Sequence, residues 1–266
     1  MTAVDSLTGP RTATLRRLTP LIGQEARRLI RHPVLWLIPP IVALTASLDG
    51  ASAGRNAGYW YGTIFVAVAF FGPLITLFAA NLVASGARRS RAEEILSATP
   101  TSDTRRTWAM SLGIALPLAG IGAVAVAAMA VIGSLNDIPA NDVMNAGELA
   151  QLPLVIAGAG LLGVLAARWL PFAGGVLITF VLATLGGLVT FRHVDGGTWW
   201  MWWTTGMTFE GWTPPPGRPW LHVAYLTGLC ACAAIAAVYR TQGRRLVLTG
   251  GPVLAATLVV GWLQLP

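Results

Sequence analysis

One charged stretch decides how this chain is organised: residues 86–108, which read GARRSRAEEILSATPTSDTRRTW. The stretch holds five arginines, whereas the flanking segments 56–87 and 107–136 contain no Asp, Glu, Lys, Arg or His. Charge confined to a short segment between two long apolar runs is typical of a loop at a membrane surface. The pattern therefore predicts two apolar helices joined by a charged loop.

The loop itself carries helix signals. Ser90 and Glu93 fit a capping box, in which the serine oxygen accepts a backbone N–H and the glutamate reaches back to the cap. A short helix over 91–98 is expected to follow, and Pro100 ends it because proline lacks a backbone donor and disfavours a helical residue before it. Thr101 or Ser102 can cap the next helix, which would continue into the following apolar run.

The composition as a whole is that of a membrane protein. Of 266 residues, 55% are hydrophobic and 11% are charged, whereas soluble domains carry about 25% charged residues. Mean hydropathy is +0.64, and several apolar runs reach the length of about 20 residues that a spanning helix needs. The predicted fold class is all-α. We expect a polytopic membrane helix bundle of 6–7 transmembrane helices, with an N-terminal amphipathic interfacial helix and a cytoplasmic coupling helix.

The charged residues exclude several function classes. All 18 basic residues are arginine, and they cluster between apolar runs, so we expect them to orient helices and not to bind nucleic acid. The absence of lysine excludes a P-loop, whose lysine contacts phosphates, so this chain is not expected to hydrolyse ATP by itself. Cys230 and Cys232 supply neither a disulfide framework nor a four-ligand zinc site, and no metal site is predicted.

The chain divides into three parts. Residues 1–19 are predicted to form a polar cytoplasmic tail. Residues 20–32 place apolar side chains at helical spacing opposite arginines, as in an amphipathic helix lying on a membrane. Residues 33–266 form the transmembrane domain, in which Pro39 and Pro40 should kink the first span. The apolar spans are expected at 34–48, 59–84, 107–133, 149–167, 171–191, 220–239 and 246–265.

The arginine positions predict the orientation of these spans. With the N-terminus inside, 15 arginines fall on the inner side, and only Arg55, Arg192 and Arg218 fall outside. Because arginine accumulates in cytoplasmic loops, the loop over 86–107 is predicted to be cytoplasmic and the last segment would place the C-terminus outside. The outer loop over 192–219 is rich in tryptophan. Its clustered indoles favour an interfacial helix or re-entrant turn, with a ligand platform as the alternative; they are Trp199, Trp200, Trp202 and Trp203.

Two further patterns bear on function. Gly158, Gly160 and Gly163 match the dinucleotide fingerprint G-x-G-x-x-G, but no strand precedes them, so we interpret them as small residues at helix contacts. The predicted spans contain no Asp, Glu or Arg, and their single histidine, His222, lies near an outer end. Ion-coupled carriers keep such groups within their spans, so ion-coupled transport is disfavoured.

The order of these motifs along the chain resembles that in the permease subunits of ABC-2-type ATP-binding-cassette transporters. The resemblance covers residues 25–33, EARRLIRHP, the second span, and above all 88–106, with Pro100 before a third span. It extends more loosely to the segment before the sixth span. That family commonly has six spans, so the segment 246–265 departs from its pattern.

The resemblance implies a function and partners. It implies a plasma (inner) membrane permease that exports a hydrophobic or amphiphilic substrate, powered by a separate ATPase subunit that binds ATP and magnesium. Two permease subunits, identical or different, would form the path through the lipid bilayer. By motif match, the ATPase-contact role falls on Glu93, Glu94, Ile95 and Leu96, and the connecting-helix role falls on Glu25, Arg28 and Arg31.

One rival class stays open from the residues themselves. His193, Asp195 and Glu210 share the outer loop and could serve a membrane-embedded enzyme with a site at the outer face. Co-purification of an ATP-binding subunit would separate the two classes.

Overall fold

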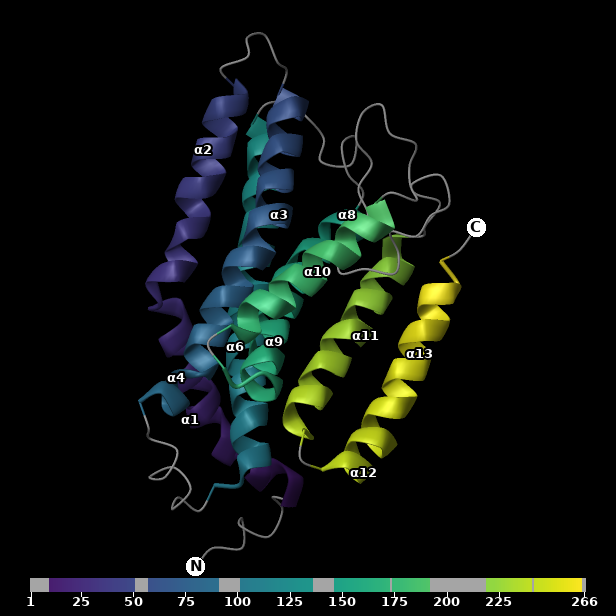
Figure 1. The fold of residues 1–266 in the computed structure, drawn as a ribbon. Coiled ribbons are helices and arrows are strands. Elements are labelled where there is room, and N and C mark those ends of the chain that lie inside the picture. The colour runs from purple at the N-terminus through teal and green to yellow at the C-terminus, as the bar shows by residue number, and fades with distance from the viewer. Residues whose placement is uncertain are drawn as a thin grey trace, which may run out of the picture.

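The computed structural model of the protein describes residues 10–50, 57–90, 101–135, 146–172, 174–191, 219–240 and 242–264 (Figure 1). Every regular element in this part of the chain is a helix, as the composition predicts. In chain order the elements are α1 (Pro10–Ile30), η1 (Pro33–Leu37), α2 (Ile38–Gly50), α3 (Ala57–Ala84), α4 (Gly86–Arg89), α6 (Asp103–Leu135), α8 (Ala146–Leu149), α9 (Gln151–Trp169), α10 (Gly175–Phe191), α11 (Pro219–Val238), α12 (Gly243–Arg245), the π-helical turn η4 (Leu246–Gly250) and α13 (Gly251–Trp262).

Five helices in the described part are long and apolar enough to cross a membrane. They are Ala67–Ala84, Asp103–Leu135, Ala146–Trp169, Pro219–Val238 and Gly243–Trp262. Two further apolar helices, Pro33–Thr45 and Gly175–Leu185, are shorter. The predicted membrane helix bundle is therefore confirmed as a class, while the count of six or seven spans stays a prediction.

α9 is the central helix of the bundle. It packs against α3, α6, α10 and α11, and its buried side chains include Leu152 and Ile156. Gly163 lies so close to α3 that a Cβ atom there would overlap the carbonyl oxygen of Leu77. Gly160 meets Leu118 of α6 in the same way. The prediction that these glycines serve helix contacts is confirmed.

α6 is longer than a bilayer requires. Its 33 residues extend over about 50 Å at 1.5 Å per residue, whereas the hydrocarbon core is about 30 Å thick. Its polar first turn, which begins at Asp103 and includes Arg105 and Arg106, therefore extends beyond the apolar part of the bundle. The predicted continuation of this helix from the loop into the third apolar run is confirmed.

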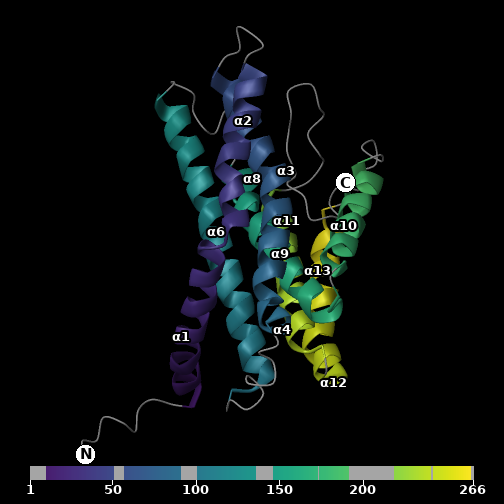
Figure 2. The same ribbon diagram turned by 60° about the vertical axis from the view of Figure 1, so that its left-hand side comes forward.

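α1 differs from the amphipathic helix predicted over 20–32. It begins at Pro10, so residues 10–19, expected to be a tail, are helical. Proline removes its own backbone donor and its ring crowds the preceding turn, yet the helix continues on both sides of Pro20. Figure 2 shows α1 beside the lower half of α6, where a Cβ on Gly113 would lie 2.7 Å from Ile22 O. α1 thus packs closely on α6, and its position on a membrane surface stays a prediction.

The predicted kink at Pro39 and Pro40 is wrong. A 3₁₀ turn, η1, precedes α2, which begins at Ile38, so both prolines fall in the first turn of α2. The first backbone N–H groups of a helix have no intrahelical partner, and proline is therefore tolerated there. The change from 3₁₀ to α-helical geometry falls before the prolines instead of at them.

α11 and α13 form an antiparallel pair (Figure 1). Cys232 Sγ lies 4.0 Å from Thr257 Oγ1, and Cys230 and Cys232 are both free. Near the end of the pair, His222 Nδ1 and Gln264 Oε1 are 2.9 Å apart. The last apolar segment therefore runs the full length of α11 and returns to the end of the bundle where α11 begins.

The two ends of the bundle differ in charge. All arginines of the described residues lie in or beside α1, α4, α12, the start of α6 and the ends of α9 and α11. These segments gather at the lower end of the bundle in Figure 1. We call it the arginine-rich end; it is the end that the arginine count predicts to be cytoplasmic.

Candidate functional site

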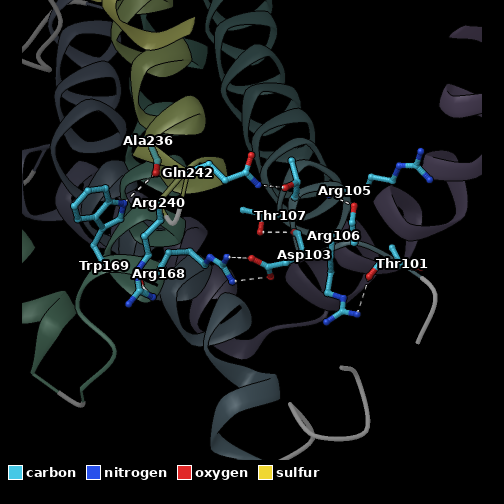
Figure 3. A network of polar contacts seen from close by, with 12 residues as sticks. Thr101, Asp103, Arg105, Arg106, Thr107, Arg168, Trp169, Ala236, Arg240 and Gln242 are labelled. Carbon is cyan, nitrogen blue, oxygen red and sulfur yellow. Dashed lines mark hydrogen bonds and ion pairs between the residues drawn. The ribbon is translucent and has the colours of Figure 1, made fainter. Parts of the chain in front are cut away.

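The last turn of α9 is tied to the first turn of α6 by an ion pair (Figure 3). Arg168 Nη1 lies 3.1 Å from Asp103 Oδ1, and Arg168 Nη2 donates to Asp103 Oδ2. This bidentate geometry suits the planar guanidinium group and fixes the relative orientation of the two side chains as well as the distance between them. The Arg168 side chain is only 18% exposed, whereas Asp103 is 56% exposed. Solvent therefore screens the pair from its acidic side.

α11 joins the same network (Figure 3). The Arg240 guanidinium donates to the carbonyl of Arg168, and Trp169 Nε1 donates to the backbone of α11 at 3.0 Å. Beyond the end of α11, Gln242 Nε2 donates to Thr104 Oγ1 of α6 at 3.0 Å. The ends of α6, α9 and α11 are thus cross-linked by side chains from all three.

The helix that precedes the charged loop, α4, also contacts α9. Arg88, in α4, donates from Nη1 to the carbonyl of Ala167 at 3.0 Å. The segment 91–100 is therefore flanked by two anchors on consecutive residues of α9: Arg88 to Ala167 on one side, and Asp103 to Arg168 on the other. This convergence is the central feature of the candidate site.

The start of α6 is capped as the sequence predicts. Ser102 Oγ accepts a hydrogen bond from the backbone N–H of Arg105 at 3.4 Å, and Thr107 Oγ1 donates to the carbonyl of Asp103 at 2.9 Å. Of the two predicted caps, Thr101 and Ser102, the serine takes the role. The cap fixes the turn from which Asp103 reaches Arg168.

Glu25 and Arg28, predicted on the connecting helix, form an ion pair at 3.1 Å. The Glu25 Cβ packs near Gly113 of α6, and Arg28 Nη2 lies beside Gly86 at the start of α4. The pair therefore connects α1 to both helices that flank the charged loop. Arg31 lies just beyond α1 and is exposed.

The other residues predicted for a site lie outside the described part of the chain. These are the loop residues Glu93, Glu94, Ile95 and Leu96, the tryptophans Trp199, Trp200, Trp202 and Trp203, and the residues His193, Asp195 and Glu210. Their roles stay predictions.

Sequence reasoning assigned no contact to Asp103 or Arg168. The two residues are separated by 65 positions, and neither belongs to a local motif. In the sequence, Asp103 and Arg168 are recognisable only as charged residues that border apolar runs, and such residues are expected at helix ends. That signal predicts where a charge lies and not which charge it meets.

Polar side chains are also buried at the opposite end of the bundle. Glu148, Gln151, His222 and Gln264 are all buried, and they come from α8, α9, α11 and the residues after α13. Of these, the sequence drew attention only to His222. Burial of a polar group is costly without a partner. His222 and Gln264 are partners for each other, and their contact joins the ends of α11 and α13.

His32 lies at the junction between α1 and η1. Burial lowers the pKa of this histidine below its ordinary value of 6.5, and the nearby positive charge of Arg89 lowers it further. His32 is therefore held toward its neutral form in the folded protein.

Within the described residues, no group of three or more His, Cys, Asp or Glu side chains is placed to hold a metal ion. No family model, curated protein or solved structure matches the chain. The fold and the five candidate spans define its class: a multi-pass helical membrane protein.

Proposed function

We propose that this chain is the permease subunit of an ABC-2-type ATP-binding-cassette transporter. In this proposal it exports a hydrophobic or amphiphilic substrate, and a separate subunit hydrolyses ATP. It lies in the plasma (inner) membrane with the arginine-rich end in the cytoplasm. A second permease subunit, identical or different, completes the path.

The observation that carries the proposal is the double anchoring of the charged loop. Arg88 bonds Ala167 O, and Asp103 pairs with Arg168, so both flanks of segment 91–100 are fixed to the end of α9. A loop attached in this way passes a displacement to the helix that contacts most of the bundle. A purely solvated loop needs no such attachment.

The packing of α9 determines where such a displacement would go. α9 fits closely against α3 at Gly163 and against α6 at Gly160, so it cannot shift along either helix without moving their side chains. Arg240 extends the connection to α11. In the proposed mechanism, an ATPase bound at Ile95 and Leu96 moves the loop, and α9 transmits the movement to its neighbours.

α1 supports the loop from the other side. The Glu25–Arg28 pair lies between α6 and α4, the two helices from which the loop emerges. In the proposal this pair holds the connecting helix in register with the loop. Arg31 remains exposed for contacts outside the chain.

The proposed topology has seven spans. η1 with α2 and α10 would be the two short spans beside the five long ones, and the C-terminus would lie outside. The exposed apolar side chains of α10 and α13, such as Leu182 and Leu258, would face lipid or the second subunit.

Co-purification tests this function directly. The full chain, tagged and extracted from its native membrane in mild detergent, should retain a subunit with ATPase activity that rises after reconstitution into lipid. Purification of a homogeneous chain with no ATP-binding partner and no effect on ATP turnover would contradict the proposal.

A further inference from the structure

The side of α1 facing away from α6, together with the residue after α1, carries a group of arginines. Arg27, Arg28 and Arg31 are exposed and border a shallow depression of about 570 Å³. Glu25 pairs with Arg28, but no carboxylate among the described residues pairs with Arg27 or Arg31. The remaining lining residues of the depression are Thr19, Pro20, Gly23 and Gln24.

The residues that follow α1 have features typical of a membrane boundary. Trp36 is 61% exposed, and its Nε1 donates to Ile30 O at 2.8 Å. An exposed indole with its polar atom turned back toward a basic segment is typical of the headgroup boundary. Leu37 and Leu44, farther along the same segment, are also about half exposed and fit the acyl region. Arg27 and Arg31 therefore lie just on the water side of the boundary.

A further arginine comes from the start of the charged loop. Arg89 is exposed at the end of α4, and its guanidinium donates to the carbonyl of Leu82. Arg28 lies beside Gly86 of the same short helix, which brings α4 against the end of α1. Arg89 is therefore a further cation near the end of α1, but it does not line the depression.

We propose that Arg27 and Arg31 bind the phosphate of an anionic phospholipid in the leaflet at the arginine-rich end. Guanidinium groups match phosphate oxygens in bidentate geometry, and arginine clusters directly beside a span attract anionic headgroups. The exposed side chains of Trp36, Leu37 and Leu44 offer apolar surface to the acyl chains. The depression beside Arg27 gives the headgroup space.

The position of the surface favours a lipid over a protein partner. It adjoins the exposed apolar side chains of Trp36, Leu37 and Leu44, and in the proposed orientation the nearest phosphates belong to the bilayer. The inference does not rest on the proposed transport function, because it concerns the chain without an ATPase.

The test compares two double variants of the full chain that lose equal charge. R27Q/R31Q removes the proposed contacts, and R244Q/R245Q removes two exposed arginines of α12 at the same end. Each purified protein is titrated in neutral detergent with phosphatidylglycerol or phosphatidylcholine. Thermal unfolding and native mass spectrometry report lipid binding.

We expect phosphatidylglycerol to raise the unfolding temperature of the wild type and of R244Q/R245Q at similar concentrations. R27Q/R31Q should need at least tenfold more phosphatidylglycerol for the same rise, with its unfolding in phosphatidylcholine unchanged. R27K/R31K, which keeps the charge but loses the planar fork, should lie between them. This lysine variant also keeps the test decisive if the glutamine variant unfolds.

Three results would overturn the inference. Equal weakening in both glutamine variants would show that net charge, and not this surface, attracts the lipid. An unchanged phosphatidylglycerol response in R27Q/R31Q would remove the site. The same unchanged response together with loss of a co-purifying ATPase would assign the surface to a protein partner.

Discussion

Asp103 and Arg168 join the first residue of α6 to the last turn of α9 through both oxygens of one carboxylate. One residue earlier in α9, the carbonyl of Ala167 accepts a hydrogen bond from Arg88. The loop between Arg88 and Asp103 is therefore closed at its base by α9.

The ion pair should be measurable as a coupling between the two residues. Because Asp103 is more than half exposed, screening limits the expected coupling energy to about 0.5–1 kcal/mol. D103A and R168A should each lower stability, and the double variant should lose less than the sum. A double-mutant cycle from thermal unfolding in detergent gives the value. Strict additivity would show that the pair contributes nothing.

The close contact of α9 with α3 predicts a strong effect at Gly163. A Cβ there would overlap Leu77 O, and separating two packed helices costs about 1–3 kcal/mol. G163A should therefore lower the unfolding temperature by several degrees. G120A is the matched control, because a Cβ at Gly120 of α6 meets nothing within 4 Å and alanine favours a helix. Equal unfolding temperatures for the two variants would contradict this packing.

Hydrophobic runs and local signals predicted much of this fold. The apolar segments, the cap at Ser102 and the packing role of Gly160 and Gly163 follow from residue type and spacing. The Asp103–Arg168 pair could not be predicted, because no local pattern links positions so far apart. The prediction at Pro39 and Pro40 failed because proline can either kink a helix or begin one. Only the adjoining η1 turn shows that these prolines belong to the start of a helix.

His32 should make stability depend on pH. Its folded-state pKa lies below the ordinary 6.5, so between these values the unfolded chain binds more protons and stability rises with pH. Stability should be greatest above pH 6.5 and fall as the pH decreases through 6.5 toward the folded-state pKa. Unfolding temperatures of the wild type and H32Q, measured from pH 5 to pH 8, should diverge in that range. Parallel curves would rule out this role.

The antiparallel pairing of α11 and α13 predicts that the two ends of α13 lie on opposite sides of the membrane. On a C230S/C232S background, P266C should react with an impermeant maleimide from outside intact cells. R244C, in α12 at the arginine-rich end, should react only after the cells are opened. Labelling of both positions under the same condition would exclude α13 as a span.

Coupling through the loop is the central claim, and one double variant tests it. Ile95 and Leu96 are apolar residues in a charged segment, and aspartates there would be costly wherever a partner covers them. I95D/L96D and a control, R244D/R245D, are each co-expressed with the co-purifying ATPase. Co-elution of the two subunits and ATP turnover in lipid are then measured. We expect I95D/L96D to fold like the wild type but lose the ATPase and its stimulation, while the control keeps both. Unchanged co-elution and turnover in folded I95D/L96D would contradict docking at this loop and the transporter assignment that depends on it.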